Sequence, residues 1–234
     1  MSLPPGHARQ LPLALRYPPD QRFDGFVAAP AGAIAQLRAL AGDRGATLYL
    51  AGAAGSGKSH LALAACADAE ARGMRAAYLP LAAAAGRLRE ALDALDAALV
   101  ALDGLDAIAG SREDEIALFD FHNRARQDGM SLLYTARVAP EALGLALPDL
   151  RSRLAQCPRI ALAMLDDEGR RQVLLQRARR RGLVLEPAAL DWLLRRAGRD
   201  LGGLTKLLDR LDQASLAAQR RVTVPFLREI LGDL

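Results

Sequence analysis

The chain has 234 residues, of which 51% are hydrophobic, so it can bury the core of one large domain or of a medium domain with a small appendage. Its formal net charge is +4, but acidic and basic residues are interspersed along nearly the whole chain, which gives only a weak signal for nucleic acid. No uninterrupted apolar run approaches the roughly 18 residues of a membrane span, so a soluble, cytoplasmic protein with no membrane partner is expected.

Three less common features also bear on function. Cys66 and Cys157 are far apart in apolar surroundings, which predicts buried thiols rather than a disulfide framework or a metal site. Lys58 and Lys206 are the two lysines among 31 basic residues, and a lysine retained among so many arginines indicates a specific role. The run RARRR at 177–181 follows acidic residues without interleaved aromatics, which is typical of a solvated helix face.

Residues 9–16, RQLPLALR, form an apolar segment that prolines isolate on both sides. Pro12 fixes its own backbone and biases Leu11 toward an extended conformation, so Leu11, Leu13 and Leu15 project to one side of a strand-like segment. The segment is too short and too interrupted by proline for a secretory signal. From spacing alone two interpretations remain: the leucines pack back on the following domain, or another protein holds the peptide.

From Thr47 onward, short buried strands alternate with helices, which is the pattern of a parallel sheet covered on both faces. The expected strands span 47–52, 75–81, 98–103, 131–137 and 159–165. The helices expected between them span 58–72, 88–95, 113–127 and 147–156.

After Asp166 the strands cease, and helices are expected at 166–181, 187–197, 200–219 and 224–231. The change of period near this residue marks a domain boundary. The expected organisation is therefore an extended arm over 1–24, an α/β domain over 25–165 and a small all-helical domain over 166–234.

The stretch GAAGSGKS, residues 52–59, stands between the first strand and its helix and fits the phosphate-loop pattern G-x-x-x-x-G-K-[ST] in full. Glycine-rich backbone lets N–H groups surround phosphates, and the helix N-terminus adds positive potential. Lys58 is expected to reach the outer phosphates and the Ser59 hydroxyl to bind Mg²⁺. The residues predicted to bind the nucleotide here are Gly52, Gly55, Gly57, Lys58, Ser59 and, beside the loop, His60.

Asp103 ends the third strand next to the phosphate loop, where its carboxylate is expected to hold the Mg²⁺ shell. Gly104 follows at the point where many ATPases of this type carry a second acid that polarises the attacking water. Its absence argues against fast hydrolysis at this site. Asp106 lies farther along and is interpreted as a turn or helix-cap residue.

The phosphate loop and the segments ALVALDGLDAIAG, IALFDFHNRAR, LLYTAR and LPDLRSRLAQ together resemble an AAA+ nucleotide-binding module. They resemble in particular the Hda family, regulatory inactivators of the bacterial replication initiator DnaA, and the resemblance runs on through the ending TVPFLREIL. It implies an α/β AAA+ module with a parallel five-stranded sheet between helices, followed by a small all-helical lid domain. It also implies ADP or ATP with Mg²⁺ as cofactors.

The N-terminal arm gains an interpretation from this resemblance. The family carries a motif of the type QLxLxL that docks on the sliding clamp of DNA polymerase III, and Gln10, Leu11, Leu13 and Leu15 match it. An extended peptide can place leucines in a hydrophobic groove while the glutamine side chain makes directional hydrogen bonds. The clamp is therefore an expected partner.

The resemblance also assigns residues around the nucleotide. Thr135 matches the first sensor position and Arg153 the arginine finger, although Arg151 is close enough to leave that choice open, and a solvated helix arginine is the plain alternative. Family members carry a second sensor arginine in the third lid helix, where this chain aligns Gly202. Lys206, one helical turn later on the same face, is expected to reach the nucleotide instead.

The implied function is regulatory. The protein would bind the clamp, DnaA and an adenine nucleotide, and promote hydrolysis of DnaA-bound ATP with weak or no ATPase activity of its own, which restrains initiation of replication. The alternative is a self-contained AAA+ ATPase that loads or moves DNA or a helicase, against which Gly104 and the missing sensor arginine weigh. No helix-turn-helix follows the lid, so no sequence-specific DNA binding is expected, and homo-oligomerisation stays open.

Overall fold

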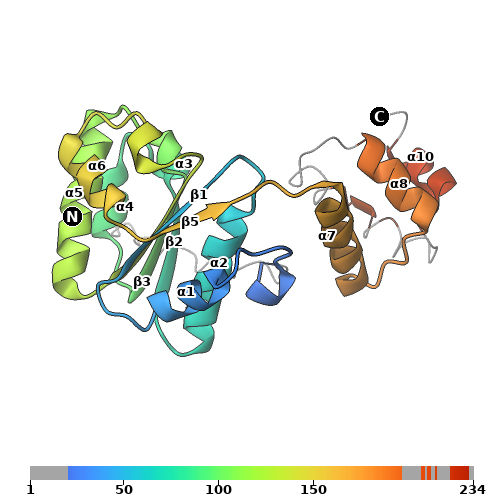
Figure 1. Cartoon of the computed structure of the whole chain (residues 1–234), viewed down its shortest axis with the longest axis horizontal. Coiled ribbons are helices and arrows are strands. Elements are labelled where there is room, and N and C mark those ends of the chain that lie inside the picture. Colours follow the sequence, from blue (N-terminus) through green and yellow to red (C-terminus); the bar gives the residue numbers. More distant parts are fainter. Residues whose placement is uncertain (1–20, 197–206, 209, 212–213, 215–221, 232–234) are drawn as a thin grey trace, which may run out of the picture.

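The computed structural model describes residues 21–196, 207–208, 210–211, 214 and 222–231, and the structural statements below concern these residues. A five-stranded parallel sheet lies between helices, and a helical domain follows it along the chain (Figure 1). This is the α/β AAA+ architecture with a helical lid that the sequence predicts.

The sheet has the strand order β2-β3-β4-β1-β5, with every neighbouring pair parallel. The strands are β1 Thr47–Gly52, β2 Ala76–Pro80, β3 Leu99–Asp103, β4 Ser131–Ala136 and β5 Arg159–Leu162. All five predicted strands are present, but β5 stops three residues earlier than 165. It pairs with β1, and its Leu162 lies opposite Gly52, the last residue of β1, so β1 offers nothing beyond that point for β5 to pair with.

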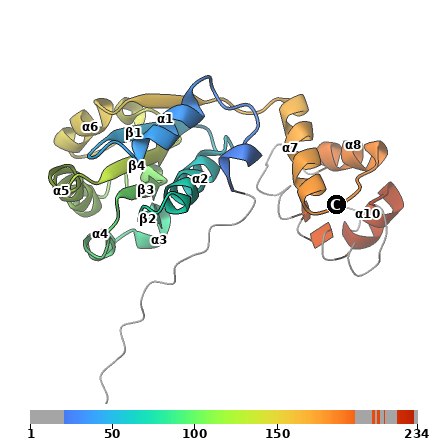
Figure 2. The same ribbon diagram turned by 90° about the horizontal axis from the view of Figure 1, so that it is seen from below.

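Helices cover both faces of the sheet (Figures 1 and 2). On one face lie α1 Ala33–Leu40 and α2 Lys58–Ala71, and on the other lie α3 Leu81–Ala84, α4 Leu88–Asp93, α5 Arg112–Asp128 and α6 Pro148–Ala155. Helix α1 falls in a stretch for which no element was predicted. Three short 3₁₀ helices join these elements: η1 Phe23–Gly25, η2 Leu105–Ala107 and η3 Pro140–Ala142.

Helix α5 illustrates how the sequence determines these elements. Ser111 caps its N-terminus by accepting a hydrogen bond from the Asp114 N–H at 3.5 Å, and Gly129 ends it. The residues that it buries against the sheet recur at helical spacing and include Ala117, Leu118, Phe121 and Ala125. Ile116 and Phe119 of the same helix are only half-buried.

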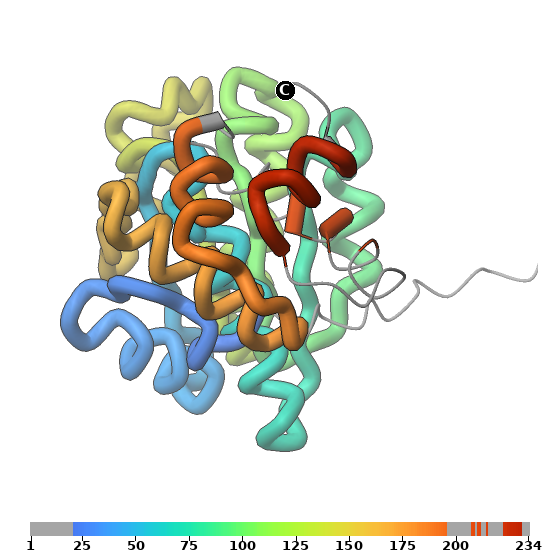
Figure 3. The backbone as a smooth tube through the Cα atoms, turned by 90° about the vertical axis from the view of Figure 1, so that its right-hand side faces the viewer, coloured from blue at the N-terminus to red at the C-terminus, as the bar shows by residue number. Residues whose placement is uncertain are grey.

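The lid has a hydrophobic core of its own, to which Leu174, Trp192 and Phe226 contribute. Its described helices are α7 Asp167–Arg180, α8 Pro187–Arg196 and α10 Val224–Leu231, and Figure 3 shows them in front of the α/β domain. A single parallel bridge joins Leu185 to Val222, in a region where the sequence predicted helices alone. Most of the helix predicted at 200–219 lies outside the described residues.

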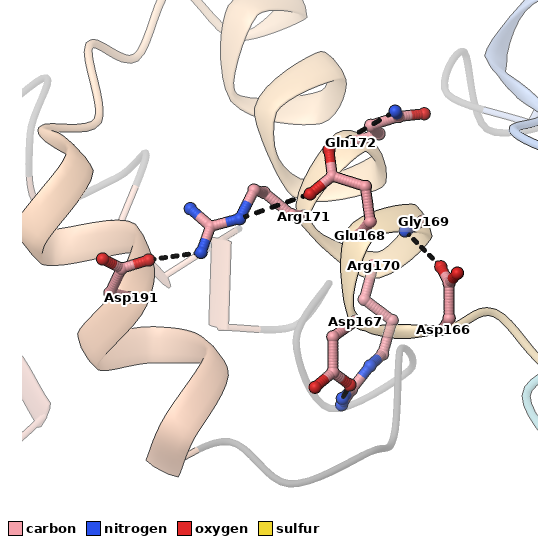
Figure 4. Close-up of polar contacts among 8 residues, drawn as sticks. All are labelled: Asp166, Asp167, Glu168, Gly169, Arg170, Arg171, Gln172 and Asp191. Carbon is pink, nitrogen blue, oxygen red and sulfur yellow. Dashed lines mark hydrogen bonds and ion pairs between the residues drawn. The ribbon is translucent and has the colours of Figure 1, made fainter.

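Short polar contacts fix the start of the lid (Figure 4). The Asp166 carboxylate caps α7 by accepting a hydrogen bond from the Gly169 N–H at 2.7 Å. Arg171 pairs with Asp191 of α8 at 2.5 Å and so connects the first two lid helices. The chain therefore changes from sheet to helix at a capped, well-defined point.

Two features of the described chain bear on the sequence-level expectations. Cys66 and Cys157 are both buried, as predicted, and burial raises the pKa of the Cys157 thiol. In the part of the chain that the structure describes, no helix combines the length and apolar character needed to cross a bilayer.

Candidate nucleotide site

The carboxyl ends of β3, β4 and β1 meet at one edge of the sheet because these three parallel strands are neighbours. The phosphate loop leaves β1 there, Asp103 is the last residue of β3, and Thr135 lies in β4 opposite Leu50. The topology thus brings together the phosphate loop, Asp103 and Thr135, although more than 80 positions separate Gly52 from Thr135 in the sequence.

The phosphate loop has the tight geometry that its glycines permit. Gly52 is the last residue of β1, Gly55 lies in the turn, and Gly57 precedes α2 with a left-handed φ of 94°. A Cβ at Gly57 would stand 2.4 Å from the Phe26 ring, so glycine is required there on two grounds. The Ser56 hydroxyl is buried with no hydrogen-bond partner among the described residues, which fits a loop built to surround a polar ligand.

Lys58 lies at the mouth of this loop. Its ammonium donates to the carbonyl oxygens of Gly52 at 2.6 Å and Ala53 at 2.9 Å. Burial lowers the pKa of Lys58, and the negative charges of Asp106 and Asp103 oppose that shift. A cation held between backbone carbonyls and two nearby carboxylates is placed to meet an incoming phosphate.

Three hydroxyl groups donate to the Asp103 carboxylate. Ser59 Oγ and Tyr78 OH reach Oδ2 at 2.7 and 2.6 Å, and Thr135 Oγ1 reaches Oδ1 at 2.5 Å. The structure therefore brings the predicted Ser59, Asp103 and Thr135 into direct contact. These charge-assisted hydrogen bonds fix the orientation of the carboxylate.

Tyr78 was not among the predicted site residues, and the signal for it lies in strand parity. In the sheet register Tyr78 pairs with Ala101, which is two residues before Asp103 in β3, so Tyr78 and Asp103 share a face. That relation needs the β2–β3 pairing, which the sequence alone does not give. Burial and the neighbouring Asp103 raise the pKa of Tyr78, so its hydroxyl remains a donor at neutral pH.

The donor set suits Mg²⁺. The hydroxyl oxygen of Ser59 and the carboxylate oxygen of Asp103 are hard ligands 2.7 Å apart. Two oxygens on adjacent positions of an octahedral Mg²⁺ shell, each at 2.0–2.1 Å, are about 2.9 Å from each other. The geometry therefore fits an ion held at this edge of the sheet.

The residue directly after Asp103 supplies no acid to the site. Gly104 has a left-handed φ of 84°, and its N–H donates to Thr135 Oγ1 at 2.9 Å. Asp106 lies within η2, and both of its carboxylate oxygens accept the Arg137 N–H, at 2.9 and 3.2 Å, so it bonds to the residue after β4 instead of capping a turn or helix as predicted. The described site thus has groups that hold a metal–phosphate complex but no carboxylate at the position that activates water in related ATPases.

A cavity of about 390 Å³ adjoins the phosphate loop. Its walls come from the loop, the segment 21–28, the end of β5 and helix α7, a combination that can accommodate a nucleoside. His60 lines the cavity, but its Nε2 also donates to the Arg22 carbonyl at 2.9 Å. Its ring packs edge-to-face with that of Phe26, with the ring centroids 5.3 Å apart. His60 thus holds the 21–28 segment over the loop, and a contact with nucleotide stays a prediction.

The C-terminal part of helix α7, which includes residues 177–180 of the basic run, contacts the α/β domain. Arg177 lines the cavity, and Arg180 pairs with Asp24 at 3.2 Å. Gln176 Nε2 donates to the Asp24 carbonyl at 3.0 Å. The prediction of a solvated face is therefore wrong for Arg177, which is half-buried beside the cavity. Arg179 and Arg180 are exposed as expected, although Arg180 also pairs with Asp24 of η1.

The two candidate finger arginines lie on α6, away from the cavity. Arg151 is exposed, whereas Arg153 is half-buried and its charge helps to lower the pKa of His122 on α5. The choice between them stays a prediction. The remaining predicted residues lie outside the described part of the chain: Gln10, Leu11, Leu13 and Leu15 of the arm, and Gly202 and Lys206 of the lid.

An AAA+ nucleotide-binding module is the class of protein that this fold and this loop define. Solved structures agree: domain III of the replication initiator DnaA from Thermotoga maritima has a TM-score of 0.75 at 19% identity, covering 93% of this chain and 98% of that one. AMPPCP-bound DnaA from Aquifex aeolicus gives 0.67 at 19% identity, covering 86% and 67%. The RuvB Holliday junction branch migration motor of T. maritima gives 0.63 at 16% identity, covering 90% and 71%.

The lid carries the more specific finding. Residues 167–231 match the family model for the Hda lid domain. The lid thus matches the Hda lid family and the fold matches that of DnaA domain III, which bears out the resemblance predicted from the sequence.

Proposed function

We propose that this protein binds an adenine nucleotide, docks on the DNA polymerase III sliding clamp and promotes hydrolysis of ATP bound to DnaA. Hydrolysis returns the initiator to its inactive state, so the protein acts in the cytoplasm as a negative regulator of replication initiation. The observation that carries the proposal is the fully oriented Asp103 beside a complete phosphate loop, followed by Gly104 rather than an acid.

The proposed mechanism divides the work between two nucleotide sites. In this chain, Lys58 and the loop N–H groups would bind the phosphates, and Ser59 and Asp103 would hold Mg²⁺, which would neutralise phosphate charge. With no acid at position 104, the bound nucleotide is not hydrolysed rapidly and instead stabilises the conformation of the protein. The reaction takes place in DnaA, where an arginine of α6 stabilises charge on the transferred phosphoryl group.

The partners follow from the lid and the arm. The Hda lid match supports DnaA as the protein acted on. The motif at Gln10, Leu11, Leu13 and Leu15 supports the clamp as the tether, which raises the local concentration of the regulator on DNA.

The test is single-turnover hydrolysis of labelled ATP bound to DnaA, with and without clamp on DNA and this protein. We expect stimulation that requires all three components and that Gln10→Ala combined with Leu11→Ala abolishes, while nucleotide binding is unchanged. A pull-down with purified clamp checks that the double variant has lost the clamp.

The alternative, a self-contained motor or loader, gives opposite results. It predicts fast ATP hydrolysis by this protein alone that disappears in Asp103→Ala, and no effect on DnaA-bound ATP. Either result would contradict the proposed function.

A further inference from the structure

Glu115 is a fully buried carboxylate that the proposed mechanism leaves unused. It lies in the first turn of α5 and has no exposed surface. Its Oε1 accepts hydrogen bonds from the Gly110 N–H at 2.7 Å and the Ala146 N–H at 3.0 Å, and its Oε2 accepts from the Leu147 N–H at 2.6 Å. A single side chain therefore binds two loops that are more than 30 residues apart.

The negative charge of this carboxylate strengthens its hydrogen bonds to the three backbone N–H groups. Bonds from N–H groups to an ionised carboxylate are about twice as strong as neutral ones. The N-terminus of the 17-residue helix α5 adds positive potential at Glu115. Loss of one acceptor would leave at least one of these three backbone N–H groups without its carboxylate partner.

Two of the three donors belong to the start of α6. Leu147 is the N-cap residue of that helix, and Ala146 precedes it. The apolar side chain of Leu147 makes no capping hydrogen bond to the first backbone N–H groups of α6. Glu115 supplies from α5 the acceptor at the entry of α6. This contact joins α5 to the entry of α6, the helix that carries Arg151 and Arg153.

The third donor connects to the Mg²⁺ edge of the sheet. Gly110 ends the segment that leaves β3 at Gly104, and the Gly104 N–H donates to Thr135 Oγ1, which in turn donates to Asp103. Glu115 therefore joins the segment that follows the metal-binding strand to the helix that carries the candidate finger.

We propose that Glu115 is a positioning residue for the trans-acting arginine of α6, which it holds at the geometry needed in the DnaA site. The inference rests on the proposed function, and it applies whether the finger is Arg151 or Arg153. A displacement of about 1 Å at a group that acts only in the transition state can reduce a rate by about 10²-fold.

The first experiment compares Glu115→Gln with two controls from the same turn of α5. The amide nitrogen replaces one carboxylate oxygen with a donor, so either the bonds from Gly110 and Ala146 or the bond from Leu147 is lost. Glu113→Gln makes the same chemical change on an exposed side chain. Asp114→Asn alters a buried carboxylate whose acceptor contact is with the Gly86 N–H at 3.0 Å, away from α6.

We expect Glu115→Gln to lose about 10²-fold in stimulated hydrolysis of DnaA-bound ATP while keeping its affinity for ADP and clamp. Both controls should stay within about twofold of the parent. Combining Glu115→Gln with Arg153→Ala, or with Arg151→Ala if that arginine proves to be the finger, should cost no more than the arginine variant alone, because both remove one function. An equal loss in Asp114→Asn, or losses that multiply in the double variant, would overturn the positioning role.

Hydrogen exchange on the nucleotide-bound full chain tests the same contact without DnaA. Glu115→Gln should raise exchange at Gly110 and over 146–151, whereas Glu113→Gln should not. Unchanged protection there refutes the inference even if the parent stimulates DnaA, whereas raised exchange in a protein that never stimulates DnaA refutes the proposed function instead. If Glu115→Gln shows no cooperative unfolding transition, Glu115→Asp replaces it, because aspartate keeps the charge on a shorter side chain. We then expect Glu115→Asp to lose more stimulated hydrolysis than Glu113→Gln and Asp114→Asn.

Discussion

At the scale of single residues, three hydroxyl groups orient the Asp103 carboxylate at the proposed Mg²⁺ site. We expect Tyr78→Phe to weaken the Mg²⁺-dependent part of nucleotide affinity about fivefold, because it removes one of three donors that orient the carboxylate. Calorimetric titration with ADP, with and without Mg²⁺, measures this. Tyr49→Phe is the matched control, since it removes a hydroxyl bonded to the Val138 carbonyl at 2.9 Å, and an equal loss there would contradict a role for Tyr78 in the metal site.

His122 gives the stability of the protein a pH dependence. Burial lowers its pKa to about 4, with the charges of Arg126 and Arg153 acting in the same direction. The unfolded chain binds this proton near pH 6.5, so the stabilisation is complete above pH 6.5 and is lost as pH falls toward 4, by at most about 3 kcal/mol. Urea unfolding at pH 7 and pH 4.5 should show a smaller pH effect in His122→Gln than in the parent, and identical pH effects would refute the assignment.

Residues whose role depends on local sequence were predictable. The phosphate loop needs a fixed order of glycine, lysine and serine between a strand and a helix, and all of these lie within eight positions. Tyr78 and Glu115 were not predictable in the same way, because their roles depend on contacts with elements far along the chain. A lone tyrosine or glutamate in an ordinary helix or strand carries no local signal of such a contact.

At the scale of elements, helix α6 is the part most directly tied to the proposed activity. We expect Arg153→Ala to keep its fold, nucleotide and clamp while losing about 10³-fold or more of the stimulated hydrolysis, since an arginine supplied in trans acts mainly in the transition state. Lysine should rescue poorly because it lacks the planar fork. The measurement is the single-turnover assay with DnaA-bound ATP.

Arg151→Ala is the matched variant on the same helix. Its side chain is exposed and that of Arg153 is half-buried, so the two differ in what they can present to a partner. Full stimulation in Arg153→Ala with loss in Arg151→Ala would move the finger to Arg151, and full stimulation in both would contradict the proposed function.

Helices and strands could be predicted where the apolar periodicity is strong. Their ends could be predicted where capping residues occur. Helix α5 begins after Ser111 and ends at Gly129, close to the predicted 113–127. The end of β5 was predicted too late because its residues remain apolar after Leu162, while its partner β1 has already ended at Gly52. Strand ends are set by pairing, which hydrophobicity does not report.

At the scale of the whole molecule, the cavity is shared by both domains. Its walls include Phe26 and the phosphate loop from one domain and Val173 and Arg177 from the other. The sequence predicted two domains but not that η1 and α7 would meet, because that contact is made by residues about 150 positions apart whose charges also suit a solvated surface. We therefore expect retention of nucleotide to depend on the contact between the domains as well as on the loop.

The pair between Arg180 and Asp24 makes that dependence measurable. The two side chains lie 3.2 Å apart, and Asp24 is 73% exposed, so the pair contributes at most about 1 kcal/mol and is screened by salt. We expect Arg180→Ala to release a fluorescent ADP analogue up to about fivefold faster at low salt with little change in its association rate, because α7 is held less firmly against η1. Stopped-flow dissociation measures this, and Arg179→Ala, which removes an exposed arginine from the same helix, is the control. The difference between the two variants should vanish at about 1 M salt, where the Debye length is near 3 Å, and equal dissociation rates at low salt would show that this contact does not retain the nucleotide.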